Sequence, residues 1–193
     1  MRKWLLNRIE DIVMNAILDS IDFHEAAAED VRFAFATFSL GTVLVAASDK
    51  GVAAILMGDN PPALTRELTR AFPTARLAAD EMGLGDMIAK VVAFLEAPHK
   101  GLDLPLDIRG GALERAVWQA LRAVPAGETI TYGQIARSLL LRATAQEVGA
   151  ACAANVLAVA VPCHRVVKAD GSISGYRWGV QRKRKLINRE AAA

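Results

Sequence analysis

Cysteine, histidine and aromatic residues are scarce in this chain of 193 residues. It has two cysteines and three histidines, and Phe, Trp and Tyr together make up 6% of it. The cysteines, Cys152 and Cys163, and the histidines, His24, His99 and His164, show none of the close-pair spacings that zinc sites need. We therefore expect no metal and no cofactor.

Long apolar runs and an export signal are also missing from the sequence. No stretch reaches the roughly 18 apolar residues of a membrane span, and Asn7, Glu10 and Asp11 interrupt the first apolar run where a signal peptide would be continuous. Apolar residues recur there at helical spacing instead, which predicts an amphipathic helix and connector over residues 1–30. We expect a cytoplasmic monomer with no membrane contact, whose cysteines are free thiols.

Charge is nearly balanced over the whole chain but unevenly distributed along it. Residues 1–108 contain 10 Lys and Arg against 16 Asp and Glu, whereas residues 109–193 contain 13 against 5. This asymmetry is compatible with a basic module that binds a polyanion. It is equally compatible with a solvated basic tail, because the run RKRK at residues 182–185 supplies half of the excess.

The pattern of apolar and turn residues predicts a mixed α/β chain of the α+β class. Residues 31–108 are expected to form a small domain with a mixed or antiparallel sheet, and Gly110-Gly111 is the best domain boundary. Residues 102–108 are expected to be an edge segment or a connector, because Pro105 has no N–H for a ladder. The strands and helices expected before it cover residues 31–38, 42–48, 52–58, 60–72 and 83–96.

Residues 109–193 are expected to form a mainly helical domain. The two short helices in its middle are compatible with a DNA-binding helix-turn-helix, and equally with a plain helical hairpin. VLAVAVPCHRVV (156–167) is expected to be a buried strand that Pro162 bends. The predicted helices cover residues 112–124, 132–140, 144–153 and 180–189.

The most reactive candidate in the chain is Cys163. Most cysteines in apolar runs are small hydrophobic residues, and we interpret Cys152 in this way. Cys163 differs because it has an ionisable neighbour, His164, and a basic setting, which would favour the thiolate. Since adjacent strand residues point to opposite faces, the two side chains need a backbone turn or a water between them. Periodicity leaves open whether Glu190 or Asp170 orients the imidazole.

PCHRVV, followed by DGSISGYRWGVQRKRKLINRE, closely resembles the active-site segment of the O6-alkylguanine-DNA alkyltransferases, and most closely the carboxy-terminal half of the bacterial adaptive-response (Ada) protein. The resemblance continues upstream through LPLDIRG, VWQALRAVPAGETITYGQIA and ACAAN, and more faintly through LGTVLVAASDKGVAAILMGD. It covers about residues 31 to 190. It implies a small sheet domain joined to a helical DNA-binding domain of helix-turn-helix type, which acts on double-stranded DNA containing O6-alkylguanine.

The resemblance also implies roles for individual residues. Cys163 would accept the alkyl group from a flipped-out base, once and irreversibly. His164 would act as its base through a water, Glu190 would hold His164, and Asn155 would brace the turn around the site.

Further residues match family positions around the DNA and the extruded base. Tyr132 matches a tyrosine that helps rotate the backbone and donates to the guanine ring. The pocket and lid positions fall on Val166, through its carbonyl, and on Ser174, Gly175 and Tyr176. Gly149, Ala150 and Ala151 keep the small side chains of a recognition helix that enters the minor groove.

The chain departs from the family at the start of this recognition helix. The position of the family arginine that fills the vacated stack falls on Gln146, and Glu147 replaces a small residue beside it. The usual Gly-x-Pro turn is replaced by Leu140-Leu141-Arg142, where Arg142 could supply the missing cation. The alternative function is therefore an alkylation-sensing or regulatory DNA-binding protein with weak or no repair activity. A cysteine hydrolase would use the same thiol and imidazole, but nothing else in the sequence indicates one.

Overall fold

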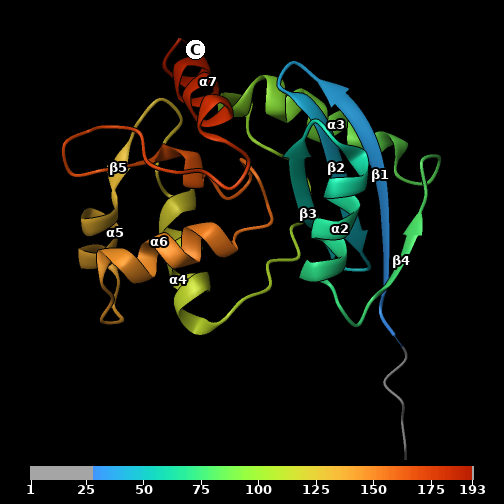
Figure 1. Cartoon of the computed structure of the whole chain (residues 1–193), viewed down its shortest axis with the longest axis horizontal. Coiled ribbons are helices and arrows are strands. Elements are labelled where there is room, and N and C mark those ends of the chain that lie inside the picture. Colours follow the sequence, from blue (N-terminus) through green and yellow to red (C-terminus); the bar gives the residue numbers. More distant parts are fainter. Residues whose placement is uncertain (1–27, 193) are drawn as a thin grey trace, which may run out of the picture.

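The computed structural model describes residues 28–192, and the amphipathic helix predicted at the amino terminus lies outside them. A sheet with its covering helices stands beside a helical region, and α7 (Val180–Ala191) lies at one end between the two (Figure 1). We call residues 30–100, which contain the sheet, the sheet half, and residues 112–191 the helical half. The mixed α+β class predicted from the sequence is the class observed.

The sheet has four strands in the order β3-β2-β1-β4. β1 (Asp30–Phe38), β2 (Gly41–Ser48) and β3 (Gly51–Gly58) are antiparallel neighbours, as predicted. β2 and β3 are almost continuously buried, because helices cover the sheet in Figure 1 and the chain that leads into the helical half packs along β3. The sequence did not predict β4 (Arg76–Ala79), which pairs parallel to β1.

Two helices pack on the sheet. α2 (Pro61–Ala71) begins where predicted, because the Asn60 side chain accepts a hydrogen bond from the backbone N–H of Ala63 at 3.0 Å. α3 (Gly85–Glu96) ends just before the 3-10 helix η1 (Pro98–Lys100). Among residues 28–192, no helix is both long and apolar enough to cross a bilayer.

The central helix of the helical half is α6 (Ala145–Ala154), which packs against α4 (Ala112–Arg122) and α5 (Tyr132–Ser138). The indole N–H of Trp118 on α4 donates to the carbonyl of Ala151 on α6 at 2.8 Å. The helix-turn-helix assignment of α5 and α6 stays a prediction. The elements of this half are α4 (Ala112–Arg122), β5 (Ile130–Thr131), α5 (Tyr132–Ser138), α6 (Ala145–Ala154), the 3-10 turn η2 (Cys163–Arg165), β6 (Val166–Val167) and α7.

Residues 156–165 do not form the buried strand predicted over residues 156–167, of which only Val166-Val167 is a strand, β6. The segment makes one short parallel contact with β3, where Ile55 donates to the carbonyl of Val156 at 2.8 Å and accepts from Ala158 at 3.0 Å. It then turns at Val159, whose φ of 65° lies in the left-handed region, and enters η2 after Pro162. The strand reading is wrong because Pro162 has no N–H for a ladder and the Asn155 side chain takes the polar groups that a strand would pair.

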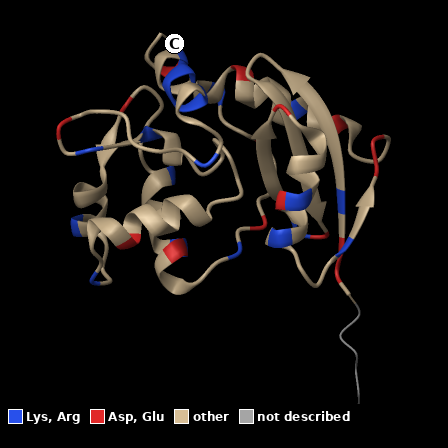
Figure 2. Cartoon of the chain, in the orientation of Figure 1, with Lys and Arg blue, Asp and Glu red and all other residues tan. Residues whose placement is uncertain are grey.

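Ion pairs join the two halves across their border. Arg182 contacts Asp59 at 2.5 Å, Arg177 contacts Glu67 at 2.6 Å and Arg189 contacts Glu96 at 3.0 Å. Opposite charges meet at this border and along α7 (Figure 2). Several arginines of the basic second half of the sequence are therefore paired with carboxylates of the acidic first half. Of the RKRK run, only Arg184 and Lys185 are freely exposed.

Candidate active site

A cavity of about 280 Å³ lies between α5, α6 and the loop before α7. It is lined by Tyr132, Gly149, Cys152, Ala153, Cys163, Gly175, Tyr176 and Arg177. The residues that border it on α6 are small, and the ring of Tyr132 lies against Gly149, where an added Cβ would meet it at 3.8 Å. The cavity therefore brings together residues from four separate parts of the sequence, among them two free thiols.

Asn155 holds the turn that carries Cys163. Its amide nitrogen donates to the carbonyl of Val161 at 2.9 Å and lies 3.3 Å from the Cys163 sulfur, and its oxygen accepts from the N–H of Leu157 at 2.8 Å. The side chain is almost completely buried. These contacts agree with the bracing position predicted for Asn155, and they explain how one amide stabilises an irregular segment of buried backbone.

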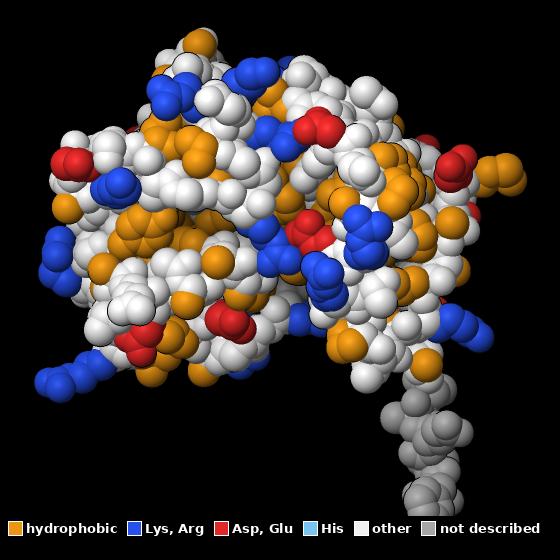
Figure 3. Space-filling view, viewed as in Figure 1, with side chains coloured by type: hydrophobic (Ala, Val, Ile, Leu, Met, Phe, Trp, Pro, Cys, Tyr) orange, Lys and Arg blue, Asp and Glu red, His pale blue; other side chains and the backbone are white. Residues whose placement is uncertain are grey.

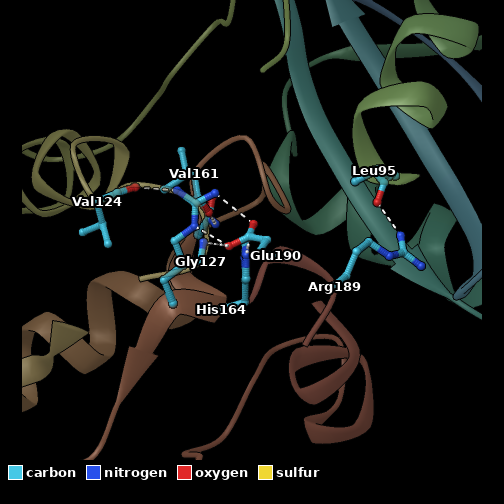
Figure 4. Close-up of polar contacts among 9 residues, drawn as sticks. Leu95, Val124, Gly127, Val161, His164, Arg189 and Glu190 are labelled. Atoms are coloured by element: carbon cyan, nitrogen blue, oxygen red, sulfur yellow. Dashed lines mark hydrogen bonds and ion pairs between the residues drawn. The ribbon is translucent and has the colours of Figure 1, made fainter. Parts of the chain in front are cut away.

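The imidazole of His164 contacts a buried carboxylate. Its Nε2 atom lies 2.8 Å from Oε1 of Glu190, on α7 (Figure 4). The alternative partner, Asp170, instead accepts a hydrogen bond from the backbone N–H of Ser172 at 2.9 Å. Among the described residues nothing bonds to Nδ1 of His164. A carboxylate partner selects the tautomer with the proton on Nε2, which leaves a lone pair on Nδ1.

Arg165 shares the same carboxylate and was missed by the sequence analysis. Its guanidinium donates to both oxygens of Glu190, at 2.8 and 2.9 Å, and to the carbonyl of Val124 at 2.5 Å. Burial alone would raise the pKa of Glu190, but hydrogen bonds from His164 and Arg165 outweigh it and lower the pKa to about 2. Burial lowers the pKa of His164 despite the carboxylate, so the imidazole is neutral at pH 7.

The two thiols of the cavity are both protonated at neutral pH. Burial raises the pKa of Cys163, although the hydrogen bond from Asn155 and the charge of Lys183 oppose it. Burial also raises the pKa of Cys152, to about 12. The expectation that the setting of Cys163 favours the thiolate is therefore wrong for this arrangement, because burial exceeds the effect of the nearby cations. Cys163 needs a base to become a nucleophile.

Lys183 is the second residue that sequence reasoning missed. It is fully buried, and its ammonium group donates to the Ser174 hydroxyl at 2.8 Å and to the carbonyl of Gly175 at 3.3 Å. The Ser174 oxygen lies 2.6 Å from the Tyr132 hydroxyl and 3.4 Å from the carbonyl of Val166. A usable signal existed, since residues 183, 186 and 190 recur at helical spacing and form the buried face of α7.

Tyr176 forms the inner wall of the cavity. Its ring makes edge-on contacts with His164 and Trp178, at centroid distances of 6.5 and 5.3 Å. Its hydroxyl is buried and has no hydrogen-bond partner among residues 28–192. Tyr132, Gly175 and Tyr176 thus line the same cavity as Cys163, and Ser174 contacts Tyr132. The roles predicted for these four residues stay predictions.

Gln146, Glu147 and Arg142 do not line this cavity. Gln146 is exposed on the first turn of α6, and Arg142 is exposed on the turn before it. The Glu147 carboxylate accepts hydrogen bonds from the backbone N–H and the hydroxyl of Thr144, at 2.7 and 2.8 Å. It therefore forms a capping box at the start of α6 rather than projecting freely.

No group of three or more potential metal-ligating side chains occurs within residues 28–192. On the face drawn in Figure 3, Lys and Arg side chains of the described part of the chain are spread over both halves and the border between them instead of forming one continuous patch. A polyanion would therefore contact separate cations.

A family model described as the DNA-binding domain of 6-O-methylguanine DNA methyltransferase matches residues 112–192. The bifunctional transcriptional activator/DNA repair enzyme Ada of Escherichia coli (strain K12) is 48% identical over 161 residues, which are 83% of this chain and 46% of Ada. A methylated-DNA–protein-cysteine methyltransferase of Mycolicibacterium paratuberculosis is 32% identical over 143 residues, 72% of this chain and 87% of that protein. The chain thus spans about half the length of Ada.

The fold resembles that of a solved relative. The O6-methylguanine methyltransferase of Mycobacterium tuberculosis, in its crystal structure with DNA, superposes with a TM-score of 0.69 at 28% identity, over 84% of this chain and 93% of that one. This likeness supports the α+β class predicted from the sequence.

Proposed function

Because the chain belongs to the methylated-DNA–protein-cysteine methyltransferase family, we propose that it repairs O6-alkylguanine in double-stranded DNA by one irreversible transfer of the alkyl group to Cys163. The observation that carries this proposal is the position of the Cys163 thiol on a base-sized cavity, in a turn whose next residue, His164, has its imidazole held by a buried carboxylate. The cavity volume of about 280 Å³ is at the small end for a ligand pocket.

The proposed reaction replaces one bond to the alkyl carbon by another. The Cys163 sulfur forms a bond to that carbon while the bond between the carbon and the guanine oxygen breaks. The thiol proton moves through a water to the lone pair on Nδ1 of His164, and the leaving guanine anion takes a proton from solvent. Glu190 stabilises the imidazolium that forms. Since the thiol, imidazole and carboxylate of this site cannot cleave a thioether, the protein reacts once.

The target oxygen lies inside the duplex, so the nucleotide must be rotated out of the stack. In the proposed complex α6 approaches the minor groove through Gly149 and Ala150, whose small side chains permit close contact. The Tyr132 hydroxyl, which contacts Ser174 in the free protein, donates to the guanine ring and makes the leaving group less basic. The carbonyl of Val166 and the residues from Ser174 to Tyr176 surround the base.

A labelled substrate tests the proposal directly. We expect incubation with duplex DNA that carries O6-[methyl-labelled]methylguanine to leave about one label per protein, as a single acceptor thiol requires. Cys163→Ala is expected to abolish the label, and Cys152→Ala, the matched control in the same cavity, to retain it. Intact mass should rise by one methyl group.

Three other outcomes would overturn this function. If Cys152→Ala takes up as little label as Cys163→Ala, the assignment of Cys163 as the acceptor is wrong. Stable binding of the damaged duplex without transfer would instead establish the sensor or regulatory role, which the exposed Gln146 in place of the family arginine favours. Continued release of product over many turnovers would indicate a hydrolase.

A further inference from the structure

A second groove shares Tyr132 with the cysteine cavity as a lining residue. Its volume is about 540 Å³, and Tyr132 borders both spaces. The other residues that line it are Thr131, Gly133, Gln134, Arg137, Ala145, Lys168 and Ala169. The two spaces are therefore neighbours with one aromatic side chain as their common wall.

Two cations project into this second groove. Arg137 comes from α5, and Lys168 follows β6. Both are exposed, and neither side chain has a hydrogen-bond or ion-pair partner within residues 28–192. In contrast, Arg177, Arg182 and Arg189 are bound to carboxylates of the sheet half. The charges of Arg137 and Lys168 are thus available to an external anion.

Local structure fixes both cations next to Tyr132. The parallel pairing of β5 with β6 places Val167 opposite Thr131, so Lys168 and Tyr132 leave the same end of this two-stranded ladder. The Arg137 guanidinium lies over Gly133, where an added Cβ would come within 3.3 Å of Nη1. Gly133 therefore allows the guanidinium to lie back along α5 toward Tyr132.

The groove contains no carboxylate that would neutralise these charges. Asp170, two residues after Lys168, is turned toward the N–H of Ser172, and Glu147 is bonded to Thr144. Lys168 is close enough to Asp170 to lower the pKa of its carboxyl, but among the residues that line the groove an anion would meet two cations and no carboxylate.

We propose that Arg137 and Lys168 bind the DNA backbone phosphates that flank the extruded nucleotide, an inference that rests on the proposed function. A base in the cysteine cavity carries phosphates on its own sugar, and Tyr132 lines both this cavity and the groove that holds the two cations. These contacts would supply positive charge to the DNA backbone in a chain that has Gln146 at the position where the family has an arginine.

The test is a salt titration of duplex binding by the full chain and by Arg137→Gln, Lys168→Gln and the double variant. Each lost phosphate contact should reduce the slope of log K against log salt by about 1, and the double variant should lose about 2. The loss should be the same for duplexes of different sequence, because phosphates carry no base identity. Lys90→Gln, an exposed lysine on α3 of the sheet half, is the matched control and should leave the slope unchanged.

Transfer from the free base O6-methylguanine separates this inference from the proposed function. The free base has no phosphate, so its slow reaction with Cys163 should be the same in the double variant and in the unsubstituted chain. Absence of transfer in every protein would contradict the proposed function, while the salt slopes would still test the phosphate contacts. If Arg137→Gln and Lys168→Gln leave the slope of log K against log salt unchanged, the inference is overturned. It is also overturned if, among the three single variants, only Arg142→Gln reduces this slope, because Arg142 would then supply the phosphate contact.

Discussion

Nε2 of His164 and Oε1 of Glu190 lie 2.8 Å apart, and the two side chains are 0% and 1% exposed. The same carboxylate binds the guanidinium of Arg165. One buried acid therefore compensates a cation and orients an imidazole, and its removal should affect both stability and chemistry.

Glu190→Gln should lower the free energy of unfolding by about 3 to 5 kcal/mol, because Arg165 would remain as a buried charge without its counterion. Glu96→Gln, which neutralises the more exposed partner of Arg189, should cost at most about 1 kcal/mol. Urea denaturation at pH 7 measures both. Equal losses in the two variants would contradict the special role of Glu190.

The contribution of Glu190 to the free energy of unfolding should disappear at low pH. Its pKa is about 2 in the folded chain, against 4.5 for the ordinary carboxyl. Because the folded-state pKa is the lower one, the stabilisation is complete above about pH 4.5 and is lost as the pH falls toward 2. The difference in unfolding free energy between the unsubstituted chain and Glu190→Gln should therefore shrink over this range, and a constant difference would contradict the assignment.

Tyr132→Phe should slow alkyl transfer from duplex DNA by at least about tenfold, since a lost hydrogen-bond donor to a developing anion typically costs 10²–10³ in rate. Binding to undamaged duplex should change little, because the ring against Gly149 remains. Tyr176→Phe is the matched control, as its hydroxyl has no partner among the described residues. Single-turnover transfer assays measure both, and equal slowing in the two variants would remove the specific role of the Tyr132 hydroxyl.

Lys183→Met should shift the reactivity of Cys163 to higher pH. The buried ammonium lowers the pKa of the thiol, so its removal leaves burial less opposed and raises that pKa further. Replacing a buried cation by an apolar side chain of similar length should leave stability nearly unchanged. The measurement is the rate of Cys163 alkylation by iodoacetamide against pH, followed by mass. The exposed Lys185→Met on the same helix should keep the original profile, and an unshifted profile in Lys183→Met would contradict the coupling.

Local signals were enough to predict most elements of this fold. Asn60 and the prolines after it define the start of α2 because a side-chain cap and a fixed φ act within a few residues. β4 was missed because its four residues, Arg-Leu-Ala-Ala, are mostly exposed and are held as a strand only by pairing with β1, more than 40 residues earlier in the chain. The segment before Cys163 was misread because a distant contact with Ile55 and the Asn155 side chain determine its path.

In the candidate site, too, some residues were predictable from local sequence signals and others were not. Cys163 and His164 were identified from a short motif, and periodicity left Glu190 and Asp170 open as partners. The family resemblance implied Glu190, and the packing of α7 against the η2 turn gives the physical reason. Arg165 and Lys183 were missed because charged side chains are normally at the surface. The helical spacing of residues 183, 186 and 190 was a local signal for Lys183, whereas Arg165 is buried by contacts with Val124 and Glu190, far away in the sequence. Burial of a charge is decided by partners that the chain brings from far away in the sequence.

Gln146→Arg should improve binding to duplex DNA and speed transfer from it. The side chain is exposed on the first turn of α6, so an arginine fits there without disturbing the core. It would add one cation on the helix proposed to enter the minor groove, and the slope of log K against log salt should steepen by about 1. Salt titration and single-turnover transfer measure the two effects.

A cation added elsewhere should not reproduce this gain. Gln119→Arg adds the same charge at an exposed position on α4 and should leave the salt slope unchanged. Glu147→Gln provides a second comparison: a glutamine at the third helical position keeps the capping box with Thr144 but removes a negative charge next to residue 146. It should tighten binding in the same direction as Gln146→Arg. If Gln146→Arg and Gln119→Arg bind DNA equally well, residue 146 does not face the duplex, and the orientation proposed for α6 is wrong.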